Sequence, residues 1–135
     1  MTSSQQIPLP APTRLSQPFW DACQRGQLLV QRCSDCDGLT FIPQPACKHC
    51  LSPRLEWTEV SGKGTVYSYT VVWRPQTPAF PVPYVVAIVD LDEGCQMMTN
   101  VVDCDPADVH VGMRVAAHFR RMSDEITLPY FRPEG

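Results

Sequence analysis

The stretch Cys33–Cys50 reads CSDCDGLTFIPQPACKHC and contains two Cys-x2-Cys pairs separated by ten residues. Two thiolates three residues apart in a tight turn can bind one ion while backbone N–H groups of the turn point at the sulfurs. Two such turns supply four sulfurs in a tetrahedron, which suits Zn²⁺. The spacing therefore predicts a structural zinc site made by Cys33, Cys36, Cys47 and Cys50, with one ion per chain and no open coordination position.

Two alternatives exist for these four cysteines. They could form two disulfides in an oxidising compartment, or they could hold iron in the same sulfur cage. The total of seven cysteines is odd, and residues 1–12 contain neither the basic stretch nor the apolar stretch of a secretory signal. We therefore favour zinc and expect a cytoplasmic protein. We interpret the single cysteines Cys23, Cys95 and Cys104 as small buried hydrophobic residues.

The residues before the cysteine pairs predict a short helix and a strand. Ser16 suits an N-cap, Pro18 suits the first helical turn, and Gly26 suits the helix end. Leu28–Arg32 then reads as a strand that leads into the first cysteine pair. Residues 1–13 are rich in Pro, Ser and Gln, and we expect this lead to be extended and mobile unless a partner holds it.

After the second cysteine pair the pattern becomes β. Five runs rich in β-branched and aromatic residues are joined by short turns, which favours antiparallel pairing. Closure into a small barrel removes exposed strand edges, as in the OB-fold, with a sandwich as the alternative. We therefore predict a mainly β protein, with a short helix and a rubredoxin-like zinc ribbon in residues 1–54 and a five-stranded OB-fold barrel with a C-terminal tail in residues 55–135. The predicted strands are 55–60, 65–73, 84–91, 95–102 and 114–120.

Composition argues against several classes of protein. The 14 prolines leave few windows long enough for a helical bundle, and no apolar run reaches the ~18 residues of a membrane span. The net charge is −3, and residues 90–108 hold six acids and no base. Domains that bind nucleic acid are usually basic. We therefore expect neither a nucleic-acid nor a membrane partner.

The chain shows no catalytic motif. It lacks a Gly-rich phosphate loop, a G-x-S-x-G sequence and an H-E-x-x-H sequence. His110 falls in a predicted loop and His118 in a predicted strand. Asp90, Asp92 and Glu93 surround a hairpin turn, where solvated acids are ordinary. We therefore expect no catalytic residue and no activity of the isolated chain.

Aromatic residues occur in three proline-containing segments. Proline lowers the entropy cost of ordering such a segment, and aromatic side chains are frequent anchors of protein interfaces. The alternative is that these segments fill the ends of the barrel. The predicted partner contacts are Phe19, Trp20, Phe80, Tyr130 and Phe131.

Several short motifs together give the chain a resemblance that spans residues 19–133. It resembles the zinc-ribbon plus OB-fold family of acyl-CoA-associated proteins, long catalogued as a domain of unknown function. Two positions depart from that family: Asp37 follows the second cysteine where Gly is common, and Pro43–Ala46 replaces a Pro-Pro-Arg sequence. The motifs are Phe19-Trp20, Gly26-Gln27-Leu28, the four ribbon cysteines, Gly62–Thr70, Pro83–Ala87, Leu91–Gly94, Gly112–Val115 and Leu128–Pro133.

The resemblance implies an accessory role beside a larger enzyme. Members are similar to small subunits of thiolases, acyltransferases and the lipid-transfer-protein-like aldolases of steroid side-chain breakdown, in which the partner carries the catalytic residues. It also implies an α2β2 hetero-tetramer and leaves open a contact with the CoA thioester at the partner interface. We therefore expect a non-catalytic subunit that stabilises a thiolase-fold enzyme acting on acyl-CoA carbon–carbon bonds.

Two other functions compete with this hypothesis. Zinc ribbons and OB barrels also bind nucleic acid, for which Tyr67, Tyr69 and Trp73 could provide stacking surfaces. The chain could also be an independent acyl-CoA-binding protein or a thioesterase-like enzyme.

Overall fold

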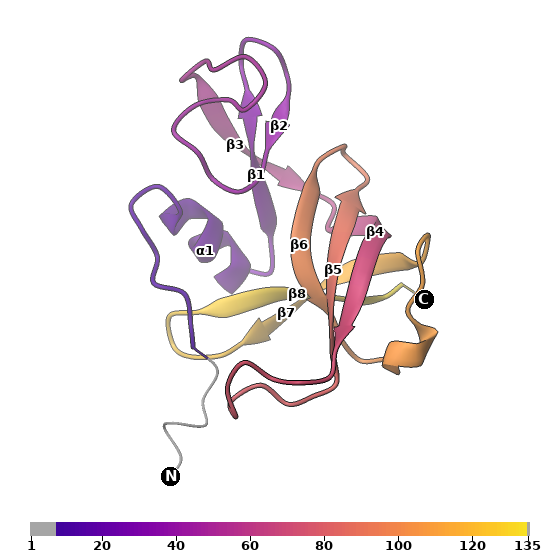
Figure 1. Ribbon diagram of the computed structural model, residues 1–135. Helices are drawn as coiled ribbons and strands as arrows, with labels where there is room; N and C mark the ends of the chain where they lie inside the picture. Colours follow the sequence, from indigo (N-terminus) through magenta and orange to yellow (C-terminus); the bar gives the residue numbers. More distant parts are fainter. Residues whose placement is uncertain (1–7, 135) are drawn as a thin grey trace.

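The computed structural model describes residues 8–134 and shows one helix between a three-stranded sheet and a β-barrel (Figure 1). Residues 1–7 of the expected lead lie outside the described residues. The elements are α1 (Gln17–Gln24), β1 (Leu28–Cys33), β2 (Leu39–Thr40), β3 (Leu55–Val60), β4 (Lys63–Val72), β5 (Tyr84–Leu91), β6 (Gln96–Val101), the 3-10 turn η2 (Pro106–Asp108), β7 (Arg114–Arg121) and β8 (Thr127–Pro133).

The first sheet, β2-β1-β3, carries the ribbon. β1 is central and pairs antiparallel with both neighbours, with Leu28 opposite Val60 and Cys33 opposite Leu55. Leu28 and Val30 point into the hydrophobic core, so the base of this sheet is held by apolar packing. The far end of β1 delivers the first cysteine pair, as the sequence predicts.

The second sheet closes into a five-stranded barrel of order β4-β5-β6-β8-β7. Residues of β5 alternate between half-buried and buried along its whole length, so every second side chain fills the interior. β7 pairs with β4 to close the barrel, and β8 joins β6 in parallel through a single bridge, Val101 to Phe131. This architecture confirms the predicted mainly β, OB-type fold.

One member of the predicted barrel was assigned wrongly. Leu55–Val60 forms β3, which pairs with β1 of the ribbon sheet rather than with a barrel strand. The fifth barrel strand is instead β8, in the segment expected to be a tail. Pro129 argues against a strand, because it lacks an N–H group. In β8 its nitrogen faces the side of β6, where no pairing extends beyond the bridge at Phe131, so no hydrogen bond is lost.

The helix α1 packs against β1, β7 and β8, and Phe19, Ala22 and Cys23 form its buried face. Its C-terminal end is linked to β8 by a hydrogen bond from the Thr127 hydroxyl to the Gln24 side chain (2.7 Å). Phe19 retains 4% of its exposure and Phe131 retains none. These two predicted partner contacts are therefore core residues, because the tail that carries Phe131 is a barrel strand.

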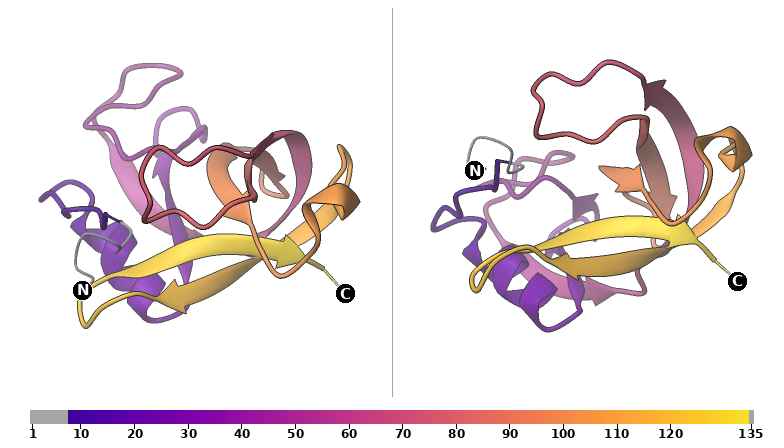
Figure 2. Two further views of the ribbon diagram at one scale, coloured as in Figure 1. Left: turned by 60° about the horizontal axis from the view of Figure 1, so that its bottom comes forward. Right: turned by 90° about the horizontal axis from the view of Figure 1, so that it is seen from below.

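The proline-rich connection between β4 and β5 leaves the barrel as a long loop (Figure 2). Phe80 in this loop packs against Tyr84 at the start of β5, with ring centroids 5.9 Å apart and the rings tilted by 35°. In the part of the chain that the structure describes, no helix is long and apolar enough to cross a membrane.

Candidate metal centre and apolar groove

The four predicted cysteine ligands meet at the tip of the ribbon sheet. Their sulfurs all lie within 4.8 Å of one another, and the Cys33–Cys50 and Cys36–Cys47 pairs are 3.6 Å apart. Four sulfurs at about 2.3 Å from one ion in a tetrahedron are about 3.8 Å apart. A disulfide needs about 2.05 Å between sulfurs. The cage therefore fits one tetrahedral ion.

Backbone N–H groups donate hydrogen bonds to cysteine sulfurs and favour the thiolate form that binds a cation. The N–H groups of Asp35 and His49 donate to the sulfurs of Cys33 and Cys47, each at 3.3 Å. Burial acts to raise the pKa of Cys47. Hydrogen bonds from the N–H groups of Cys50 and His49 and from the neighbouring thiols outweigh this effect and lower the pKa to about 6. The pKa of Cys36 is raised to about 12 by burial and by its neighbouring sulfurs, despite the N–H of Gly38. The four thiols cannot all ionise together unless a cation binds.

The residue after each cysteine pair adopts a left-handed backbone. Asp37 has φ 63° and Leu51 has φ 66°. This region favours glycine and tolerates aspartate better than leucine. The geometry explains why glycine suits the position of Asp37 in related ribbons. It also identifies Leu51 as a strained, exposed residue that the sequence does not reveal.

A polar network joins the two cysteine turns. The Asp35 carboxylate accepts hydrogen bonds from the Ser52 hydroxyl and from the guanidinium of Arg54. Arg54 and Ser52 lower the pKa of Asp35, which keeps this link charged. His49 is exposed, and its Nε2 lies 3.1 Å from the Leu39 carbonyl rather than in the cage.

The single cysteines fit the structural interpretation. Cys23 and Cys95 are buried, and Cys104 is half-buried. Burial raises the pKa of the Cys23 thiol to about 12 and also raises the pKa of Cys95 and Cys104. Such thiols are poor nucleophiles at neutral pH.

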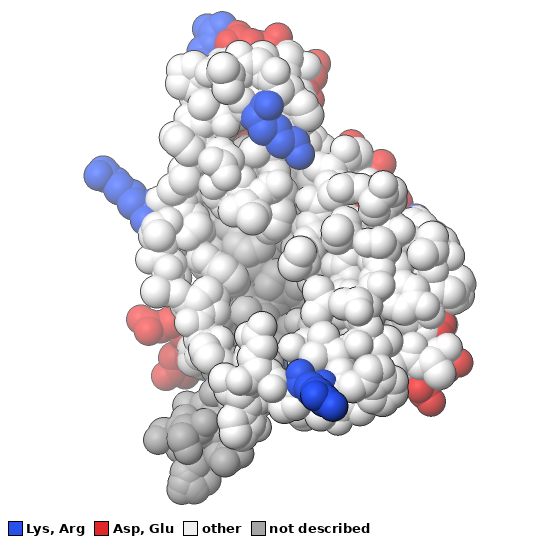
Figure 3. Space-filling model, in the orientation of Figure 1, with Lys and Arg blue, Asp and Glu red and all other residues white. Residues whose placement is uncertain are grey.

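A second feature is an open apolar groove of about 560 Å³ between α1, β6 and β8. Figure 3 shows this face hollowed in the middle and almost free of charged side chains. None of the residues that line the groove is charged. The lining residues are Pro10, Ala11, Thr13, Leu15, Ser16, Phe19, Trp20, Phe41, Ile42, Pro43, Phe80, Met97, Met98, Thr99, Asn100, Leu128, Pro129 and Tyr130.

Four of the five predicted partner contacts line the groove. Trp20, Phe80 and Tyr130 are half-buried on its walls, and Phe19 contributes the little surface that it keeps. The segment from Phe41 to Pro43 forms another wall. The buried Gln31 side chain holds that segment through two hydrogen bonds with the backbone of Gln44, at 2.7 and 2.9 Å.

Sequence reasoning missed the two most exposed large apolar side chains of the groove. Met98 and Ile42 are exposed to 68% and 65%. Outward alternation in the predicted strand 95–102 would have placed Met98 on the surface, but nothing in the sequence places it beside α1. Ile42 lies in the ribbon loop. A loop has no regular alternation of side chains, so the sequence does not predict which way this side chain points.

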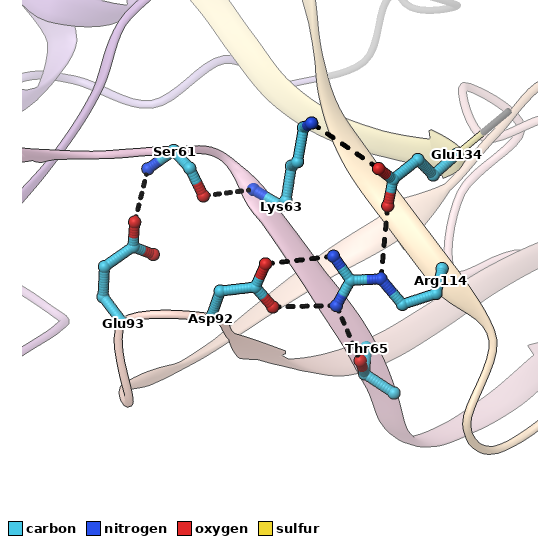
Figure 4. Close-up of polar contacts among 7 residues, drawn as sticks. All are labelled: Ser61, Lys63, Thr65, Asp92, Glu93, Arg114 and Glu134. Atoms are coloured by element: carbon cyan, nitrogen blue, oxygen red, sulfur yellow. Dashed lines mark hydrogen bonds and ion pairs between the residues drawn. The ribbon is translucent and has the colours of Figure 1, made fainter.

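The acids of the β5–β6 turn have structural roles, which the expectation of solvated acids missed (Figure 4). Arg114 donates two hydrogen bonds to Asp92, at 2.8 and 3.0 Å, and a third to Glu134. Glu93 accepts a hydrogen bond from the Ser61 N–H at 2.8 Å. The Arg114 guanidinium lowers the pKa of Asp92. The lowered pKa keeps the Asp92 carboxylate ionised, so this group is unsuited to proton transfer near neutral pH.

Comparison with known protein families gives matches across most of the chain. Residues 20–56 match the model of the ChsH2 rubredoxin-like zinc ribbon domain, and residues 57–120 match the ChsH2 C-terminal OB-fold domain. The chain is 38% identical over 104 residues to a DUF35 domain-containing scaffold protein of Methanocaldococcus jannaschii. This alignment covers 76% of this chain and 74% of that protein. The chain belongs to the DUF35 family.

One solved chain and one longer protein are also similar to this chain. A solved chain described as "Ltp2-ChsH2(DUF35) aldolase" is 41% identical and superposes with a TM-score of 0.83 over 93% of this chain and 98% of that one. A probable enoyl-CoA hydratase alpha subunit of Thermomonospora curvata is 41% identical over 126 residues. That match covers 93% of this chain, but the chain spans only about 40% of the relative's length.

Proposed function

We propose that this chain is a non-catalytic accessory subunit that binds and stabilises a thiolase-fold or lipid-transfer-protein-like enzyme acting on acyl-CoA carbon–carbon bonds. The main support is the full-length superposition on the chain described as part of an Ltp2-ChsH2(DUF35) aldolase. The uncharged groove supplies a surface for the larger subunit, because a hollow lined by apolar side chains is typical of a protein interface.

The zinc ion has a structural role in this proposal. Cys33, Cys36, Cys47 and Cys50 would hold it, and the closed sulfur set leaves no position for a substrate. The ion fixes the ribbon loop whose residues Phe41, Ile42 and Pro43 form one wall of the groove. Metal binding and partner binding would then be coupled through the position of that wall.

The complex we propose is an α2β2 hetero-tetramer in the cytoplasm, with one small subunit beside each active site of a thiolase-like dimer. A docked barrel excludes water from the entrance to the acyl-CoA site and can contact the thioester there. The steroid side chain remains one candidate for the acyl group. A hydratase is the alternative partner, since one relative is described as a hydratase subunit.

Co-expression with a candidate thiolase-fold subunit, chosen from the open reading frames that neighbour the gene for this chain, tests the proposal. We expect the two to elute together at the mass of a hetero-tetramer and the partner to lose most of its activity when this chain is omitted. Separate elution with unchanged partner activity would refute it. Turnover of an acyl-CoA by the isolated chain would favour an independent enzyme, and a salt-dependent shift of single-stranded DNA would favour a nucleic-acid-binding domain.

A further inference from the structure

One wall of the groove is an incompletely paired strand edge. β6 pairs with β5 along its whole length, from Gln96 to Val101. On its other side it meets β8 through a single bridge, and the Val102 N–H donates to the Phe131 carbonyl at 2.8 Å. Beyond that point the Thr99 hydroxyl donates to the Pro129 carbonyl at 3.0 Å, and among the described residues no strand other than β5 pairs with β6 from Gln96 to Met98.

The backbone of Met98 faces this open side. In an antiparallel pair, successive residues direct their N–H and C=O groups to opposite sides of the strand. Val102 points its N–H group at β8, so Met98, four residues earlier, points its backbone groups to the same side. Met98 also lines the groove. The groove therefore combines a free strand edge with an apolar, uncharged lining.

These two properties restrict what can cover the groove. A charged segment would lose its hydration without finding an opposite charge among the lining residues. A purely apolar cover, such as a helix face, would leave the Met98 N–H and C=O groups buried and unpaired, which costs about 1–3 kcal/mol for each. An extended apolar segment satisfies both conditions, because its own backbone groups pair with the strand edge.

We infer that the partner subunit inserts an extended, uncharged apolar segment into this groove, where it adds to β6 as a further strand. About three residues suffice, because that length spans about 10 Å and matches the part of β6 from Gln96 to Met98 that β8 does not contact. The exposed side chains of Met98 and Ile42 provide apolar contacts on either side of the inserted strand. This inference rests on the proposed function, since the segment belongs to the partner enzyme.

Three lysine substitutions test the surface. Met98→Lys and Ile42→Lys place a charge in the groove, whereas Val111→Lys changes a side chain of similar exposure, 63%, that does not line it. With the co-expressed thiolase-fold subunit we expect Kd to rise at least about tenfold for the two groove variants and to stay within about twofold for Val111→Lys. Equal affinities for all three variants would overturn the inference.

Hydrogen exchange at the Met98 amide tests strand addition itself. We expect fast exchange in the isolated chain and exchange slower by about 100-fold in the complex. A complex that forms while this amide stays fast would refute strand addition and leave the proposed function intact. Failure of the wild-type chain to form any complex would refute both. Slow exchange in the isolated chain would mean that this chain, or a second copy of it, fills the groove, and would also overturn the inference.

Discussion

The ribbon tip and the barrel are stabilised by different means. Around the metal centre the buried residues are Cys33, Cys47, Thr40 and Ser52, which offer little apolar surface. The barrel interior is filled by closely packed Val side chains and Phe131. The tip therefore depends on ligand bonds and hydrogen bonds, and the barrel on removal of apolar surface from water. The difference shows that one chain of 135 residues uses two independent sources of stability.

Removal of a metal ligand should give the largest effect and should act on the ribbon alone. Cys36→Ser leaves three sulfurs, so we expect loss of bound zinc, unprotected amides in residues 34–54 and a barrel that stays folded. Cys104→Ser, which changes a half-buried single cysteine, is the matched control and should keep one zinc per chain. Elemental analysis and hydrogen exchange measure both. Loss of barrel protection in Cys36→Ser would show that the two regions are not independent.

Truncation in the barrel should give the next largest effect. Phe131→Ala removes a fully buried ring and should lower the free energy of unfolding by about 3–5 kcal/mol in a denaturant titration. Phe80→Ala, in the loop outside the barrel, should cost about 1 kcal/mol or less. If Phe131→Ala lowered the free energy of unfolding as little as Phe80→Ala is expected to, the barrel would tolerate a cavity at its parallel bridge.

A change in the ribbon that releases backbone strain should be stabilising. Leu51→Gly removes the cost of a left-handed leucine, about 1 kcal/mol, and should raise the apparent zinc affinity about fivefold. Asp37→Gly should gain less, because it also removes the ion pair with Arg32 at 2.6 Å. Competition with a zinc chelator measures both affinities. A lower affinity for Leu51→Gly would contradict the strain argument.

The smallest expected effect concerns the barrel surface and pH. Arg114 lowers the pKa of Asp92 in the folded chain below its usual value of 3.8, so the carboxylate favours folding above about pH 4. That contribution is lost as the pH falls through the lowered pKa. Asp92→Asn should therefore unfold more easily than wild type near pH 7 and should approach it near pH 2.

Urea titrations across this pH range measure the difference in unfolding free energy. Asp124→Asn, at a fully exposed side chain outside this network, should follow the wild-type curve more closely. A difference between Asp92→Asn and wild type that does not shrink in acid would exclude the ion pair as its origin.

The sequence predicted the features that depend on short spacings. The two Cys-x2-Cys pairs, the helix between Ser16 and Gly26 and the hairpin of β5 and β6 all follow from local patterns, and the structure has them. The identity of the fifth barrel strand did not follow. β3 and the other strands have the same β-prone composition, and only pairing between distant residues, such as Leu28 with Val60, distinguishes them.

The sequence did not predict the groove, only a set of aromatic partner contacts. Trp20, Phe80 and Tyr130 were identified because proline and aromatic residues are conspicuous in loops. Met98 and Ile42 were not, since their importance comes from tertiary placement beside α1. Phe131 was misinterpreted for the same reason: its burial depends on the closure of the barrel, which no local pattern reports.

The position of β8 after all the other barrel strands has a consequence for biosynthesis. The ribbon sheet is complete once Val60 has been made, so this part can capture its ion while the ribosome is still translating the rest. The barrel cannot close before Phe131 emerges, because β8 joins β6 to β7. A nascent chain would therefore carry a completed metal site ahead of an open sheet, and a polypeptide truncated before β8 would bind zinc without closing the barrel.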